Sequence, residues 1–125
     1  MMVDLTIDHV QLAIPIGGED AARSFYGVLL GLSELPKPPE MVGRGGCWFQ
    51  LGAQQLHVGV EADFHAAKKA HIALATDELA ALRHRIEAAG HATKDDSPVE
   101  GRYRFFAEDP FGNRIEFMDR VARGI

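Results

Sequence analysis

The chain has 125 residues, of which 46% are hydrophobic, and it carries a formal net charge of −5 at pH 7. This length fits one ordinary domain or two very small modules sharing a core, and the apolar content is too high for a disordered protein. The acidic balance and the scattered basic residues argue against a nucleic-acid partner. No apolar run approaches the ~20 residues that span a bilayer, which argues against a membrane protein.

The N-terminus and the cysteine usage bear on localisation. The chain begins MMVDLTIDH, which lacks the basic start and the long apolar segment of a signal peptide. Cys47 is the single cysteine, so no disulfide can form within the chain and nothing indicates an oxidising compartment. We therefore expect a cytoplasmic protein.

The first half of the sequence predicts a strand, a helix and further strands. Residues 5–14 alternate with period two, and apolar residues then recur at helical spacing over 21–32. Residues 37–45 indicate a loop or a poor edge strand, and strands are expected over 46–51 and 54–61. This half forms a first module over residues 1–61.

The second half repeats this order after a polar connector over residues 62–69. A strand over 70–75 precedes a helix whose apolar stripe includes Leu79 and Ile86, and Gly90 ends that helix. A short strand is expected over 91–94, a loop over 95–101, strands over 102–108 and 114–119, and a turn at the DPFGN sequence between them. Each half is thus β-α-β-β-β, with the second module over residues 70–120.

Two pairs of segments echo each other and place polar residues at equivalent positions. DHVQLAIP and AHIALAT each put a histidine, His9 or His71, at the start of an alternating run. QQLHVGV and NRIEFMD likewise match His57 to Glu116. In every case the apolar neighbours point to the opposite face of the strand. If the helices cover the apolar faces and the sheets curl, all four polar residues line one cup.

Three imidazoles and one carboxylate converging on one point are suited to a divalent ion such as Zn, Ni, Mn, Co or Fe. Four protein ligands on an octahedral ion leave two positions for water or substrate, as catalysis needs. Three further residues are candidates for substrate binding. Gln11 lies two positions after His9 on the same face, Trp48 can form a hydrophobic wall, and Arg104 can hold an anionic group by paired hydrogen bonds.

The segments DPFGNRIEF and AHIAL resemble the vicinal oxygen chelate superfamily, which includes glyoxalase I, fosfomycin-resistance thiol transferases, bleomycin-resistance proteins and extradiol dioxygenases. The resemblance implies an α+β fold of two βαβββ modules forming a cup-shaped curved mixed sheet with the helices on the outer face. It also implies metal ligands at His9, His71 and Glu116, a fourth ligand at His57, and a catalytic role for Glu116 as a base.

One departure from glyoxalase I matters, because that enzyme usually carries a glutamate where this chain has His57. We therefore expect a metal-dependent glyoxalase-like enzyme that chelates a small molecule through vicinal oxygens, as a lyase, isomerase or thiol transferase. Two alternatives stay open. One is a metal-free drug-binding protein of the bleomycin-resistance type, and the other is a non-haem iron dioxygenase that uses His9, His71 and Glu116.

The resemblance further implies a homodimer with its sites at the interface between chains. His9 and His57 would then come from one chain, and His71 and Glu116 from the other. The sequence by itself establishes two modules and leaves open whether they pair within a chain or across a dimer.

Overall fold

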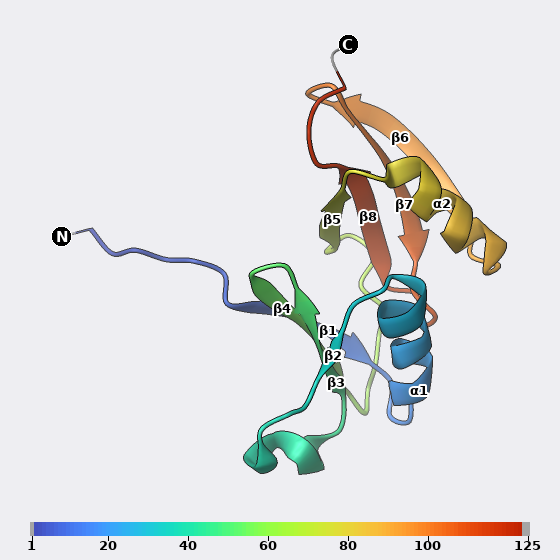
Figure 1. The fold of residues 1–125 in the computed structure, drawn as a ribbon. Coiled ribbons are helices and arrows are strands. Elements are labelled where there is room, and N and C mark those ends of the chain that lie inside the picture. The colour runs from blue at the N-terminus through green and yellow to red at the C-terminus, as the bar shows by residue number, and fades with distance from the viewer. Residues whose placement is uncertain (1, 124–125) are drawn as a thin grey trace. The chain divides into compact units, whose positions relative to one another are not determined.

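The computed structural model describes residues 2–123, and the chain divides between His65 and Ala66 into two compact units. Each unit contains one four-stranded mixed sheet and helical segments (Figure 1). Within the described residues, no helix is long and apolar enough to span a membrane.

Unit 1 builds its sheet with a parallel pair at one edge, formed by its first and last strands. Its elements are β1 (His9–Ile14), α1 (Glu19–Ala22), the π-helix η1 (Arg23–Leu29), β2 (Glu34–Leu35), the 3₁₀ helix η2 (Pro39–Arg44), β3 (Cys47–Leu51) and β4 (Gln54–Val60). The strand order is β1-β4-β3-β2, with β1 parallel to β4 and the other neighbours antiparallel.

Unit 2 repeats this topology. Its elements are β5 (Ile72–Thr76), α2 (Leu79–Ala88), β6 (Thr93–Val99), β7 (Arg102–Glu108) and β8 (Arg114–Asp119). The order β5-β8-β7-β6 again sets the first strand parallel to the last and the others antiparallel. The predicted α+β fold of two βαβββ modules is confirmed.

The core of unit 1 lies between its sheet and its helical segment. Phe49 and Leu56 are fully buried, and the Tyr26 ring centroid lies 6.0 Å from that of Phe49. A Cβ atom at Gly27 would lie 3.5 Å from the Phe49 ring, an ordinary van der Waals distance, so the helical segment packs directly against the sheet here. Because side chains alternate along a strand, His57, which follows Leu56, points to the other face.

The core of unit 2 has the same layout. Phe105 and Phe117 stack with ring centroids 5.2 Å apart, and Ile86 of α2 is fully buried. The helix packs across this face of the sheet (Figure 1). Each such buried side chain contributes about 1.5–3 kcal/mol to the stability of the fold. Phe106 and Glu116 alternate with these residues and therefore face away from α2.

Gly46 fixes the approach of β3 to β4, the strand that carries His57. Its φ is +82°, a conformation that L side chains rarely adopt, and an added Cβ would lie 2.2 Å from the carbonyl oxygen of Val58. Any other residue would push the two strands apart.

The first strand begins later than its alternation predicts. The expected strand over 5–14 starts at His9, because its pairing with β4 begins there. Val3, Leu5 and Ile7 precede it and are all exposed. These apolar residues share strand parity with His9 rather than with Val10, so the alternation changes phase before the paired strand starts.

Two other segments differ from expectation. The expected loop over 95–101 is wrong, since β6 continues to Val99; this strand pairs on one side alone, so its exposed polar residues carry no alternation signal. The expected regular helix contains a π-helical stretch, in which the amide of Leu30 donates to the carbonyl of Phe25 at 2.9 Å. This wider turn accommodates two consecutive buried aromatic side chains, Phe25 and Tyr26.

Candidate metal centre

In unit 1 the predicted ligands His9 and His57 lie side by side on the face away from the helix. The ring centroids are 4.2 Å apart and the ring planes are inclined by 17°. Trp48, on the strand beside His57, stacks on the same imidazole at 4.0 Å and 2°. His57 is thus held between two rings and is 5% exposed.

Each of these imidazoles has one nitrogen engaged by a neighbouring side chain. His9 Nδ1 lies 2.9 Å from a carboxylate oxygen of Asp8, and His57 Nε2 lies 2.8 Å from the amide oxygen of Gln55. Such a contact fixes the ring and leaves the second nitrogen available to a metal ion. Burial, and then the neighbouring His9, lower the pKa of His57, which favours the neutral form that binds metals.

In unit 2 the predicted ligands His71 and Glu116 are in direct contact. His71 Nε2 lies 3.0 Å from Glu116 Oε1, while its Nδ1 donates to the carbonyl oxygen of Lys69 at 2.9 Å. Two donor atoms bound side by side on one ion at ~2.1 Å each are themselves roughly 3 Å apart. The contact therefore has the separation that a shared divalent ion requires, and its donor chemistry fits such an ion.

The four predicted ligands form two pairs, one in each unit. Across residues 2–123, no three His, Cys, Asp or Glu side chains lie close enough together to enclose a metal ion. Each unit by itself therefore offers two donors at equivalent positions, on its first strand or just before it and on the strand paired with it in parallel.

The candidate substrate residue Arg104 lies on the same face as Glu116. Its Nη1 is 3.3 Å from Glu116 Oε2, its Nε donates to the carbonyl oxygen of Ser97 at 2.9 Å, and its Nη2 is 3.3 Å from Asp96. The guanidinium is therefore engaged by three protein groups and orients the Glu116 carboxylate. A role in substrate binding stays a prediction.

Gln11 also lies on the predicted face, directly across the strand pair from His57. Its amide packs over Gly59, where an added Cβ would come 2.7 Å from Gln11 Nε2. The glycine therefore makes room for this side chain beside the histidine pair.

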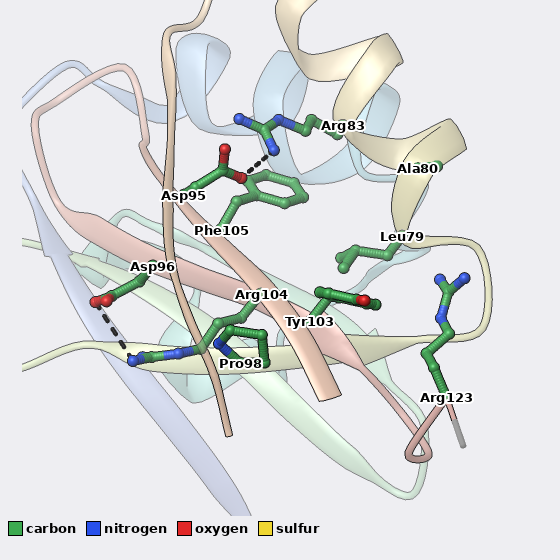
Figure 2. A pocket seen from close by; sticks show the side chains of 10 residues that line it. All are labelled: Leu79, Ala80, Arg83, Asp95, Asp96, Pro98, Tyr103, Arg104, Phe105 and Arg123. Atoms are coloured by element: carbon green, nitrogen blue, oxygen red, sulfur yellow. Dashed lines mark hydrogen bonds and ion pairs between the residues drawn. The ribbon is translucent and has the colours of Figure 1, made fainter. Parts of the chain in front are cut away.

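A pocket of about 500 Å³ lies on the other side of unit 2, between α2 and the strands β6 and β7 (Figure 2). Its charged groups are largely engaged with carboxylates: Arg83 pairs with Asp95, Arg104 with Asp96, and Arg123 with Asp119. Arg104 lines this pocket and also contacts Glu116, but none of the four predicted ligands lines it.

Sequence reasoning missed several residues that surround the two pairs. Asp8 and Gln55 contact the histidines of unit 1, and Phe106 meets the His71 ring edge-on at 5.4 Å. Arg114 stacks on Phe106 with its guanidinium carbon 3.8 Å from the ring centroid. Arg114 could have been found, since the alternation of β8 puts it on the same face as Glu116. Phe106 lies on that face as well, directly across from Glu116 on β7.

The comparisons with known proteins identify the family and the fold. The family model described as the Glyoxalase/Bleomycin resistance protein/Dioxygenase superfamily matches residues 6–117. No curated protein matches the chain. The crystal structure of a glyoxalase family protein from Bacillus anthracis is 44% identical, with a TM-score of 0.91 over 97% of this chain and 99% of that one.

Two more distant structures share the fold. Lactoylglutathione lyase from Agrobacterium tumefaciens is 23% identical, with a TM-score of 0.75 over 98% of this chain and 99% of that one. A fosfomycin resistance protein from Listeria monocytogenes is 14% identical, with a TM-score of 0.70 over 97% and 96%. Given the family match over most of its length, the chain belongs to the glyoxalase/bleomycin resistance protein/dioxygenase superfamily.

Proposed function

We propose that this protein is a metal-dependent enzyme that acts on a small molecule through two vicinal oxygens. The ligands of the divalent ion are His9, His57, His71 and Glu116. One observation carries the proposal: both units hold a donor pair at equivalent strand positions, with imidazole on imidazole in unit 1 and imidazole on carboxylate in unit 2.

When bound, a divalent ion polarises the substrate oxygens and stabilises negative charge that develops on them. The residues of the chain supply the rest of the chemistry. Glu116 accepts a proton from the substrate on one carboxylate oxygen, and Arg104 holds that carboxylate in place through its Nη1. Trp48 and Gln11 offer an apolar wall and an amide beside the histidine pair.

The superfamily and the fold support an enzyme of this type. Its members include a lactoylglutathione lyase and a fosfomycin resistance protein, which act on different compounds. Because one fold serves several reactions, the reaction of this chain has to be decided at its own site. The proposal covers a lyase, an isomerase or a thiol transferase.

The first test is metal content. We expect chelator-treated protein, dialysed and titrated with Zn²⁺, Ni²⁺ or Mn²⁺, to bind about one ion per chain, because four neutral or anionic donors are available. Calorimetry and elemental analysis measure this ratio. Failure to bind any of the three ions would favour a metal-free binding protein, while oxygen uptake with Fe²⁺ and a catechol would favour a dioxygenase.

We also propose that the protein is a homodimer in which each site takes one pair from each chain. A hybrid of two defective chains tests this. His9→Ala leaves the unit 2 pair intact, and Glu116→Ala leaves the unit 1 pair intact. If sites form across the dimer, co-expressed variants regain one complete site in each hybrid dimer, whereas each variant alone has none.

Each variant chain carries a different affinity tag, so that two affinity steps purify the hybrid dimer. Zn²⁺ is then titrated into this hybrid. We expect about one tightly bound ion per hybrid dimer. An affinity no better than that of either variant alone would contradict an interface site and indicate that both pairs come from one chain.

A further inference from the structure

A second pocket in unit 2 opens on the same face as Glu116 and has a volume of about 580 Å³. Phe106 forms part of its wall. The Phe106 ring meets the His71 ring with their centroids 5.4 Å apart, and the guanidinium of Arg114 lies over the Phe106 ring. The pocket therefore adjoins the His71–Glu116 pair.

The pocket carries two cations without a carboxylate partner. Within residues 2–123, no hydrogen bond or ion pair engages the side chain of Lys94 or Arg114. Lys68 differs, because it donates to Glu108 at 3.0 Å and to the carbonyl oxygen of Gly112 at 2.9 Å. An arginine stacked on an aromatic face keeps the N–H groups at its edge free for an oxyanion.

The charge balance of this pocket is the reverse of that of the whole protein. Its lining includes Lys68, Lys94 and Arg114 against the single carboxylate of Glu108, in a chain with a net charge of −5. The pocket beside α2 offers no such excess. Figure 2 shows Arg83 paired with Asp95 and Arg104 paired with Asp96, and Arg123 pairs with Asp119. Positive charge is thus concentrated next to the predicted ligands.

We propose that this pocket binds an anionic group of the substrate: a carboxylate, phosphate or phosphonate. The free edge of Arg114 gives it two parallel hydrogen bonds, Lys94 adds a point charge, and Phe106 packs against the adjoining carbons. Arg114 and Glu116 are two positions apart on one face of β8, a separation of ~7 Å. The substrate therefore carries its anionic group about that far from its chelating oxygens, an inference that rests on the proposed function.

Phenylphosphonate is a suitable probe, and benzamidine is its cationic counterpart. Both are titrated into the full chain after removal of metal, and the backbone amide signals of Phe106 and Ala107 are followed by NMR. We expect saturable shifts with phenylphosphonate and none with benzamidine. The Lys94→Met/Arg114→Met double variant should raise the dissociation constant at least about tenfold, because two charge-assisted contacts are lost. The control Lys69→Met should change it less than about twofold.

The single variant Lys94→Met should weaken phenylphosphonate binding by about threefold. Because Lys94 is exposed and its loss removes no packed group, this variant tests the proposal even if the double variant misfolds. Equal binding of benzamidine, or an unchanged dissociation constant in the Lys94 and Arg114 variants, would overturn the proposal. Since the titration uses metal-free protein, its failure is separate from failure of the metal site. Zn²⁺ affinity of the double variant, which we expect to stay at the level of the unmodified chain, reports on that site.

Discussion

Replacement of Glu116 with alanine is expected to lower the affinity of the protein for Zn²⁺ by about 100-fold or more. The variant loses the single carboxylate of the proposed ligand set and leaves His71 Nε2 without its partner at 3.0 Å. His71→Ala should have a comparable effect from the other side of this contact. Competition titration against a chromophoric chelator measures both changes.

Glu108→Ala is the matched control, because it removes a carboxylate from the neighbouring strand of the same sheet. Glu108 pairs with Lys68 at an exposed position, so Zn²⁺ affinity should stay within about twofold of the original value. Circular dichroism establishes that all variants are folded. An unchanged affinity in both the Glu116 and the His71 variants would remove this pair from the ligand set.

The Asp109→Ala variant should lose about 2–4 kcal/mol of unfolding free energy. Asp109 is 4% exposed and organises the turn that leads into β8. Its Oδ1 accepts hydrogen bonds from the amides of Phe111 and Asn113, both at 2.9 Å, and its Oδ2 accepts one from the Asn113 side chain at 3.0 Å. Alanine removes the acceptor of all three of these hydrogen bonds.

Urea unfolding followed by circular dichroism measures this loss. Asp63→Ala is the control, since Asp63 is exposed and its side chain makes no hydrogen bond within the described part of the chain; we expect a change below about 0.5 kcal/mol. The loss of unfolding free energy for Asp109→Asn should lie between those of the two alanine variants. The new side chain keeps an acceptor oxygen in place of Oδ1, but its NH₂ group replaces Oδ2 and faces the NH₂ group of Asn113. A loss for Asp109→Ala no larger than for the control would show that the turn holds without this network.

Strands with a buried face were predictable from sequence, and a strand with little burial was not. The bounds expected for β7 and β8 agree with the structure, because buried apolar residues such as Phe105 and Phe117 mark both strands. In β6 nearly every side chain is exposed, so its hydrogen bonds to β7 leave no trace in the hydrophobic pattern. The π-helical turn likewise depends on packing that periodicity does not encode.

For the site, the sequence could indicate which residues share a strand face but not which atoms meet. The repeat predicted that His71 and Glu116 lie on the same side of the sheet, and their contact follows from the parallel register of β5 and β8. The contact of Arg104 with Glu116 depends on side-chain rotamers, as does the stacking of Trp48 on His57. Whether the two donor pairs come together depends on how units and chains are arranged, and the hydrophobic pattern of single strands does not specify this.

The two consecutive phenylalanines of β7 divide their roles between opposite sides of one strand. Phe105 packs against Phe117 under α2, whereas Phe106 meets His71 and Arg114. A substitution at Phe106 therefore alters the surroundings of His71, while one at Phe105 alters the packing under α2. Descendants of this sequence can consequently diverge in the compounds they accept while inheriting an unaltered scaffold.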